Sequence, residues 1–412
     1  MHNPRRDFRL LLLGQTTSQL GTQVSGVVVP LLAVLTLDAS PFELGLVSAA
    51  GTLAFALIGL PAGAWIDRWP RRPVLVAADV ARAALLLTIP VAAFLGILTV
   101  TQLIVVSLLV GAGRVFFDVG YQSYLPTLTG SDRLLSANSA METLRAGGQF
   151  VGPGLGGWLV ALVGAANVVL LQSVTFAVSA ASLIGIRTPE PPPVPPARRV
   201  RLRAQIAEGW RFVAGDPVIR ATAVTSALGN MAFAVAGAVS VVFMVRDLGL
   251  SPTGVGLVIA AGSVTVMAGA ALTPRLARVV GETRIVWLSL AVTGPLGLLV
   301  PLARPGWSVA LLVIGMAAGE FGQVVYAITN VTLRQRRCPP ELLGRVTATM
   351  RFLIMGLFPL GAFVGGVLGS LVGVRATLWV SGALIIVSAV PVNLAIRRER
   401  LRGSGWREPS GG

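Results

Sequence analysis

The chain has 412 residues, of which 54% are hydrophobic and only 12% are charged, and its formal net charge is +16. A soluble domain has about 25% charged residues, so this chain lacks the charge to cover a soluble surface. The composition excludes an ordinary soluble protein and predicts an all-α polytopic membrane protein. His2 and Cys338 are the single histidine and the single cysteine. We therefore expect no disulfide framework, no metal site and no cofactor.

Twelve apolar segments follow one another along the chain. A helix needs about 20 residues to cross a bilayer, and a spanning segment must be helical because its backbone polar groups find no water in lipid. The predicted spans are 9–36, 43–66, 73–96, 100–124, 134–163, 165–187, 217–245, 253–275, 283–302, 306–332, 342–371 and 374–396. Arg5, Arg6 and Arg9 precede a first run that is too long for a cleaved signal peptide, so none is expected.

The arginines are divided unequally between the two sides of the predicted membrane. Twenty-six lie in the termini and in the loops after even-numbered spans, against three on the other side, namely Arg246, Arg304 and Arg375. Cytoplasmic loops carry the excess of positive charge, so we predict that both termini are cytoplasmic. This topology accounts for the positive net charge, and no nucleic-acid partner is expected.

The longest connection divides the spans into two groups of six. It begins with a proline-rich run and continues with Arg201 to Phe212, which predicts a basic amphipathic helix at the membrane surface. The predicted domains are an N-terminal six-helix half at 1–187, this cytoplasmic linker at 188–216, a C-terminal six-helix half at 217–396 and a basic, disordered cytoplasmic tail at 397–412.

The two halves share sequence features at an offset of about 208 residues. Asp132-Arg-Leu-Leu corresponds to Pro340-Glu-Leu-Leu, and the glycine-rich segment around Pro153 corresponds to the one around Pro359. An even number of spans in each half predicts a parallel repeat, not an inverted one.

Three motifs resemble those of the major facilitator superfamily. The loop Gly59-Leu-Pro-Ala-Gly63-Ala-Trp-Ile-Asp67-Arg68-Trp-Pro-Arg71-Arg72 is similar to the family's signature loop, although Pro70 stands where a glycine is usual. Arg114 resembles the family's fourth-span arginine, and Gly148-x-x-x-Gly152-Pro153-x-x-Gly156-Gly157 is similar to its antiporter motif. The run FFDVGYQSYLP…LLSAN looks like the branch that includes macrolide and enterobactin exporters. The resemblance covers essentially the whole chain and implies twelve transmembrane helices in two six-helix halves, the major facilitator fold.

The resemblance also implies roles for two of these motifs. Asp67, with the cluster Arg68, Arg71 and Arg72, would latch the halves together at the cytoplasmic side. The partner of Asp67 would be either the N-terminal dipole of the eleventh span or Arg345. The alternative for the arginines is a topology signal alone. Gly148, Gly152 and Gly156 share one helix face, which allows a close approach to a partner helix. Pro153 can kink that helix, so we expect a close-packed pivot here. The alternative is that glycine and proline are simply common in membrane helices.

Charged residues inside a membrane span cost about 2.5–3.5 kcal/mol each, so each needs a reason. Asp79 and Arg82, and likewise Glu142 and Arg145, are three residues apart, and Arg114 and Asp118 are four apart. These spacings predict three ion pairs within single helices.

Glu320 has no basic neighbour in the middle of its own span. A carboxyl group at that depth can carry a proton or bind a cationic substrate. We expect Glu320 first and Asp118 second as coupling residues, with Glu142 and Arg114 as further candidates. The alternative for Glu320 is an ion pair with Arg114 or Arg351. A set of glutamines in the first span, Gln15, Gln19 and Gln23, can line a cavity or bond between helices.

The sequence predicts a secondary active transporter in a bacterial cytoplasmic membrane. The leading prediction is proton-coupled efflux of a small lipophilic compound, such as a drug, macrolide or siderophore, by alternating access. Its expected partners are the lipid bilayer, the small-molecule substrate and protons, and we expect it to act as a monomer. The alternatives are a nutrient or metabolite importer with the same fold, a transport-inactive sensor, and a membrane-embedded enzyme. No recognisable nucleophile or acid–base pair supports an enzyme.

Overall fold

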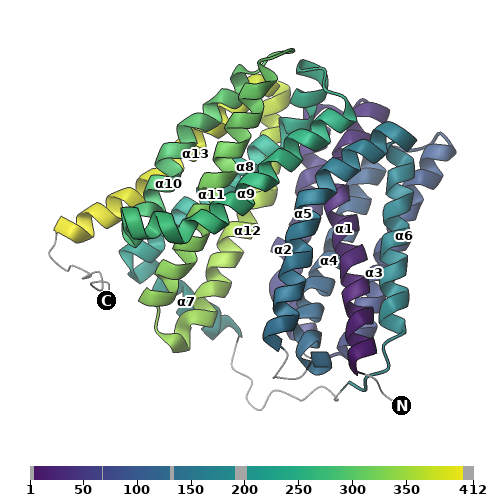
Figure 1. Cartoon of the computed structure of the whole chain (residues 1–412), viewed down its shortest axis with the longest axis horizontal. Coiled ribbons are helices and arrows are strands. Elements are labelled where there is room, and N and C mark those ends of the chain that lie inside the picture. The colour runs from purple at the N-terminus through teal and green to yellow at the C-terminus, as the bar shows by residue number, and fades with distance from the viewer. Residues whose placement is uncertain (1–3, 67, 130–133, 191–201, 402–412) are drawn as a thin grey trace.

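The structure is a computed structural model that describes residues 4–66, 68–129, 134–190 and 202–401, and these residues are almost entirely helical (Figure 1). The N-terminal half contains α1 (Pro4–Thr36), α2 (Pro41–Ile66), α3 (Arg71–Phe94), α4 (Val100–Thr129), α5 (Leu134–Val163) and α6 (Ala165–Ile184). The connection contains α7 (Leu202–Gly215). The C-terminal half contains α8 (Pro217–Val242), the π turn η2 (Phe243–Asp247), α9 (Pro252–Val280), α10 (Glu282–Leu296), the 3-10 turn η3 (Gly297–Leu302), α11 (Val309–Arg337), α12 (Pro340–Leu371) and α13 (Val374–Leu401).

The twelve predicted spans are confirmed. Twelve helices of the described residues are long and apolar enough to cross a membrane, and they begin and end within a few residues of the predicted limits. Short turns separate several of them, and glycines with positive φ form these turns, as at Gly164 between α5 and α6 and at Gly373 between α12 and α13.

The helices pack in the same way in both halves. In the N-terminal half, α1 packs against α5 and α6, α4 against α2 and α3, and α3 against α6. The same pattern recurs in the C-terminal half when each helix is replaced by its counterpart: α8 packs against α12 and α13, α11 against α9 and α10, and α10 against α13. The halves are therefore parallel repeats, as the sequence offset predicted.

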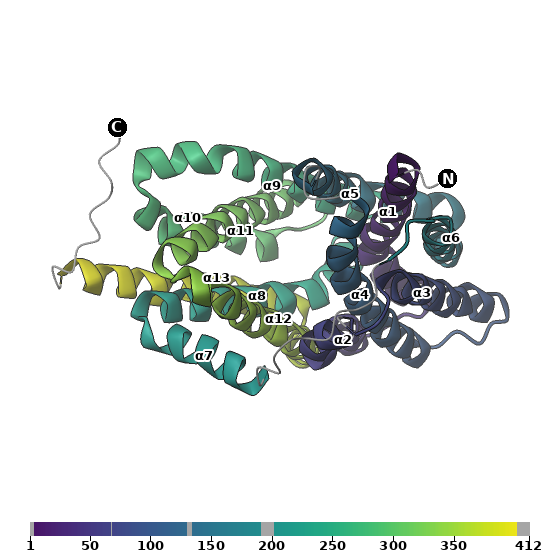
Figure 2. The same ribbon diagram turned by 90° about the horizontal axis from the view of Figure 1, so that it is seen from below.

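Among the described residues, two helix pairs make the most extensive contacts between the halves. Figure 2 shows α5 beside α9 and α2 beside α12, and these pairs have extensive contacts. The two pairs are themselves equivalent, because α2 corresponds to α9 and α5 corresponds to α12. The sequence repeat is clear at the start of α2 and α9, where residues 40–47 read SPFELGLV and residues 251–258 read SPTGVGLV.

The predicted amphipathic helix of the linker is present as α7. It packs against α12 and α8 on the outside of the C-terminal half (Figure 2). Val213 is buried against this half, and Glu208 forms an ion pair with Arg345 of α12. Residues 191–201, with most of the proline-rich run, lie outside the described residues.

The prediction that the tail begins at Arg397 is wrong for its first turn. α13 continues to Leu401, because two contacts with the C-terminal half hold this turn in place. Arg337 forms an ion pair with Glu399 at 2.8 Å, and the guanidinium of Arg397 lies 5.9 Å from the ring centre of Trp287. Residues 402–412 lie outside the described residues.

Candidate functional site

A cavity of about 270 Å³ lies between the two halves and contains Glu320. One wall residue comes from the N-terminal half, Thr52 of α2, and the others come from α8, α11 and α12. The complete lining is Thr52, Asn230, Phe233, Glu320, Gln323, Met355 and Phe358. The cavity therefore combines one carboxyl group and two amides with aromatic and thioether surface.

Glu320 has no ion pair with any described residue. Both arginines that the sequence offered as partners are engaged elsewhere. The Nε of Arg114 lies 3.6 Å from Asp118, and the guanidinium of Arg351 lies 5.1 Å from the ring centre of Phe55. Glu320 thus faces the cavity without a counter-ion, which is the situation predicted for a coupling residue.

The three predicted ion pairs within single helices are all present. Arg114 pairs with Asp118 on α4, and Arg145 pairs with Glu142 at 2.8 Å on α5. These two pairs are substantially exposed, whereas the pair of Asp79 and Arg82 on α3 is fully buried. Three of the four predicted coupling candidates, Asp118, Glu142 and Arg114, are therefore already neutralised by a neighbour.

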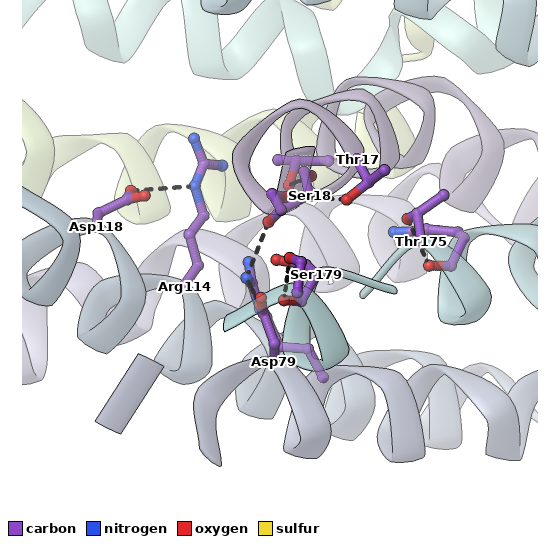
Figure 3. A network of polar contacts seen from close by, with 12 residues as sticks. Thr17, Ser18, Asp79, Arg114, Asp118, Thr175 and Ser179 are labelled. Carbon is purple, nitrogen blue, oxygen red and sulfur yellow. Dashed lines mark hydrogen bonds and ion pairs between the residues drawn. The ribbon is translucent and has the colours of Figure 1, made fainter. Parts of the chain in front are cut away.

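The buried pair on α3 is the centre of the polar network in Figure 3. The guanidinium of Arg82 donates to Asp79 and, at 3.1 Å, to the hydroxyl of Ser18 on α1. It also lies 4.7 Å and 4.2 Å from the ring centres of Phe117 and Phe176. This network joins α3 to α1, α4 and α6, so it lies in the packed interior of the N-terminal half.

The predicted antiporter motif on α5 has two faces. A Cβ atom placed on Gly152 would lie 2.5 Å from the Cβ of Gln23, and one on Gly156 would lie 3.3 Å from the carbonyl oxygen of Val24. These two glycines therefore allow α5 to approach α1 within the same half. Gly148 lies on the same face, where a Cβ would reach the side chain of Gln23 at 3.6 Å, and Pro153 is buried within the helix.

Gly157 lies on the other face and contacts the opposite half. A Cβ placed there would lie 2.3 Å from the carbonyl oxygen of Pro252 and 2.9 Å from the Cα of Gly256, both on α9. The equivalent contact on the other side of the molecule joins Gly45 of α2 to Gly366 of α12, where a Cβ on Gly45 would lie 2.6 Å from the Cα of Gly366. Two backbone-to-backbone contacts therefore hold the halves together at the end of the bundle that is opposite to the chain termini.

A salt bridge closes the same end. Arg246 in η2 donates to the carboxylate of Asp38 at 2.5 Å and to the carbonyl oxygen of Ala39 at 2.9 Å. Asp38 precedes α2 and has a positive φ of 49°, a conformation that aspartate adopts more readily than most residues.

Replacing Arg246 with glutamine is expected to favour opening of this end. The pair is exposed, with 34% and 95% of the two side chains accessible, so its loss should cost about 0.2–1 kcal/mol. Pulsed EPR distances between spin labels at Ile97 and Trp307, both in exposed turns at this end, would measure the shift. Arg304→Gln, at the same end, is the control. Identical distance distributions for Arg246→Gln and wild type would contradict a role for the salt bridge.

In this conformation the described latch residues contact their own half or the connection between the halves, and not the opposite half. The backbone N–H groups of Arg71 and Arg72 donate to Glu190 at 2.7 Å and 3.2 Å. The Arg72 guanidinium donates to the carbonyl oxygens of Leu183 and Ile184 at the end of α6. Arg345 is paired with Glu208 of α7. Arg68 is exposed, and Asp67 lies outside the described residues.

The predicted glutamine set is not part of the cavity around Glu320. Gln15 is 5% exposed, and its Oε1 has no hydrogen-bond partner among the described residues. Neither observation tests whether Gln15 lines a cavity or bonds between helices, so its role stays a prediction. Gln19 and Gln23 are half-buried, and for them the prediction remains open.

Sequence reasoning missed most of the cavity wall. Gln323 follows Glu320 by three residues, so helical spacing alone was enough to place it on the same face. Asn230 is an amide in the middle of an apolar span and carried a similar signal. Thr52, Phe233, Met355 and Phe358 carried none, because such residues are common throughout the spans.

Comparisons with known proteins agree with this architecture. The Major Facilitator Superfamily model matches residues 11–358 and 231–411. The chain is 29% identical to the multidrug efflux pump Tap of Mycolicibacterium fortuitum, over 97% of this chain and 98% of Tap. It is 28% identical to the enterobactin exporter EntS of Citrobacter koseri, over 96% and 93%.

Solved structures show the same fold. A bacterial homologue of the iron transporter ferroportin in an inward-facing state superposes with a TM-score of 0.78 at 19% identity, covering 96% of this chain and 100% of that one. The nucleoside transporter NupG superposes with a TM-score of 0.74 at 14% identity, covering 94% and 99%. With twelve membrane-spanning helices in two equivalent halves and a family match along its length, the chain belongs to the Major Facilitator Superfamily.

Proposed function

We propose that the protein exports a small lipophilic compound across the cytoplasmic membrane in exchange for protons. Two relatives that align over nearly the whole chain are named as exporters, one of multiple drugs and one of enterobactin. The walls of the Glu320 cavity are mainly Phe233, Met355 and Phe358. Aromatic and thioether surface suits an apolar ligand, and the few polar groups orient it. This cavity, with its unpaired carboxyl group, is the observation that carries the proposal.

The arginine distribution indicates which side the cavity opens to. By the positive-inside rule the end that carries the termini faces the cytoplasm. The described contacts between backbone atoms of the two halves, at Gly157 with Gly256 and at Gly45 with Gly366, lie at the opposite end. At the cytoplasmic end, the ion pairs Arg71–Glu190 and Arg337–Glu399 do not connect the two halves. The conformation is thus one that loads substrate from the cytoplasm.

Alternating access then requires the cytoplasmic end to close and the opposite end to open. Rocking of one half against the other around a central site is the general means. The predicted latch of Asp67 and Arg345 belongs to the closed cytoplasmic end. In the present conformation Arg345 is held by Glu208, so forming that latch exchanges one carboxylate partner of Arg345 for another.

Glu320 is the group that couples the two fluxes in this proposal. A carboxylate without a counter-ion in the membrane loses its charge only by binding a proton or a cation. Substrate and proton can therefore compete for the same cavity. Glu320 releases its proton when the compound binds, and the compound leaves when Glu320 binds a proton again. The pairs Arg114–Asp118 and Glu142–Arg145 carry their neutralising partner with them and have no such requirement.

Replacing Glu320 with glutamine is expected to abolish proton-driven transport while leaving compound binding largely intact. The amide keeps the shape of the carboxyl group and cannot exchange a proton. Substrate-induced proton movement in proteoliposomes, screened with macrolides, other lipophilic drugs and siderophores, measures the effect. Glu142→Gln is the matched control, because Glu142 already has Arg145 as its counter-ion, and it should retain coupling.

Each outcome of this experiment is informative. Wild-type proton movement that survives in Glu320→Gln would refute the role of Glu320. It would transfer that role to Asp118, or to Glu142 if Glu142→Gln lost coupling. Transport of a compound by the wild type without any proton movement would refute proton coupling.

A further inference from the structure

The outer surface of the N-terminal half has a groove that shares no lining residue with the cavity around Glu320. Its volume is about 500 Å³, and it runs between α3 and α4. Val74, Ala77 and Ala81 of α3 form one wall, Gly113 and Phe116 of α4 form the other, and Trp69 closes one end. Every residue that lines this α3–α4 groove is apolar, so it suits a hydrocarbon chain.

The groove faces lipid and not the space between the halves. α3 packs chiefly against α4 and α6 of its own half. Its exposed residues Ala77 and Ala81, in the wall of the groove, continue along the helix into Ala84, Leu87 and Val91 as an unbroken apolar stripe.

The α4 wall has the same orientation. Val105 and Leu109 are exposed about two turns and one turn before Gly113, on the same side of α4. The charged Arg114 points about 100° away around the helix axis, on the side where it pairs with Asp118. An exposed surface that is apolar along both helices contacts lipid chains.

The length of the groove matches one leaflet of the bilayer. From Arg71, where α3 begins, to Ala81 the helix rises by about 15 Å, at 1.5 Å per residue. The hydrocarbon core of a bilayer is about 30 Å thick, so one leaflet accounts for about half of it. The groove starts at the arginine-rich end and therefore lies in the leaflet next to that end.

An exposed arginine, Arg68, directly precedes Trp69, which lines one end of the groove. The side chain of Arg68 has no ion pair or hydrogen bond with any described residue. Its neighbours are engaged, since Arg71 lies 3.7 Å from Glu190 and Arg72 binds carbonyl oxygens of α6. Arg68 is thus available to an anion from the membrane surface.

Aromatic rings stand beside this cation. Trp65, Trp69 and Phe116 form a stack, with ring centres 6.0–6.5 Å apart and ring planes within 24° of each other. Tryptophan rings are enriched at the level of lipid headgroups. The stack places the boundary between headgroup and hydrocarbon at the mouth of the groove.

We propose that the α3–α4 groove is a binding site for an anionic phospholipid of the arginine-rich leaflet. One acyl chain occupies the groove between α3 and α4, and the phosphate group binds Arg68. The bound lipid touches Trp69, in the connection between α2 and α3, and so holds that connection against α4. The proposal does not depend on the transported compound or on proton coupling.

The test uses phosphatidylglycerol with a photoreactive diazirine near the middle of one acyl chain. The full-length protein is reconstituted in bilayers that contain this probe, illuminated and digested, and the adducts are mapped by mass spectrometry. We expect adducts concentrated on the peptides that cover residues 69–81 and 113–116. Unlabelled phosphatidylglycerol should compete, and phosphatidylcholine should not. Adducts spread evenly over all lipid-facing helices would overturn the proposal without any variant.

Two substitutions test the chain and the headgroup separately. Ala81→Phe fills the groove and should remove the adducts, whereas Ala84→Phe, one turn further along the same exposed stripe, should not. Arg68→Gln should weaken competition by phosphatidylglycerol roughly fivefold, the contribution of one arginine near an anionic surface. Equal adducts in Ala81→Phe and wild type would refute the site. Displacement of the probe by a lipophilic drug but not by phosphatidylglycerol would show that the groove takes transport substrate instead.

Discussion

Replacing Gly157 with leucine is expected to abolish transport and to leave a folded, membrane-inserted protein. A side chain at this position meets backbone atoms of α9, with the carbonyl oxygen of Pro252 2.3 Å from the added Cβ. Backbone atoms cannot move aside as a flexible side chain can, so the two halves must separate at this end. The substitution therefore destabilises the conformation described here relative to one that is open at the opposite end, and the cycle stops.

The measurement combines transport in proteoliposomes with the EPR distance between labels at Ile97 and Trp307. Gly157→Leu should lengthen that distance and lose transport. Gly147→Leu is the matched control, because a Cβ at Gly147 on the same helix has no neighbour within 4 Å. Wild-type transport by Gly157→Leu would show that the α5–α9 contact is not required for the cycle.

Removal of Asp79 is expected to have the largest effect on stability. Asp79 is 0% exposed and Arg82 is 2% exposed, so Asp79→Leu leaves a buried guanidinium without its counter-ion. Breaking a buried ion pair in this way costs about 3–5 kcal/mol. The apparent melting temperature of the purified protein should fall sharply.

Two controls separate this effect from a general sensitivity of the charged pairs. Asp79→Leu/Arg82→Leu should regain much of the lost stability, because replacing both partners of a buried pair with apolar groups is often neutral. Glu142→Gln breaks an exposed pair, with side chains 67% and 48% accessible, and should change stability by at most about 1 kcal/mol. A melting temperature of Asp79→Leu equal to that of wild type would show that the pair does not stabilise the N-terminal half.

Each feature that was predicted well from the sequence lies within one helix. The spans follow from the length of apolar runs, and the pairs Asp79–Arg82, Arg114–Asp118 and Glu142–Arg145 follow from the spacing of one helical turn. In each case both partners lie on the same helix, so no knowledge of the tertiary arrangement was needed.

The features that the sequence could not predict depend on which helices meet. The spacing of Gly152 and Gly156 indicated a close-packed face but not that α1 covers it, and the adjacent Gly157 gave no sign that it contacts the other half. Arg345 pairs with Glu208 of α7, a partner 137 residues away that no periodicity indicates. The last turn of α13 was predicted as disordered, because its stabilising contacts with Arg337 and Trp287 are tertiary.

The two glycine contacts between the halves have a consequence for how such a molecule is assembled. Gly45 with Gly366 joins the second helix of the first half to the fifth helix of the second, and Gly256 with Gly157 joins the same two elements in the reverse direction. In a pair of identical six-helix chains these would be one contact used twice, as in any isologous dimer. A duplicated and fused gene therefore inherits an interface that is already self-complementary. The connection from residue 188 to 216 then needs only to raise the effective concentration of one half around the other. The contacts between the helices determine how the two halves dock.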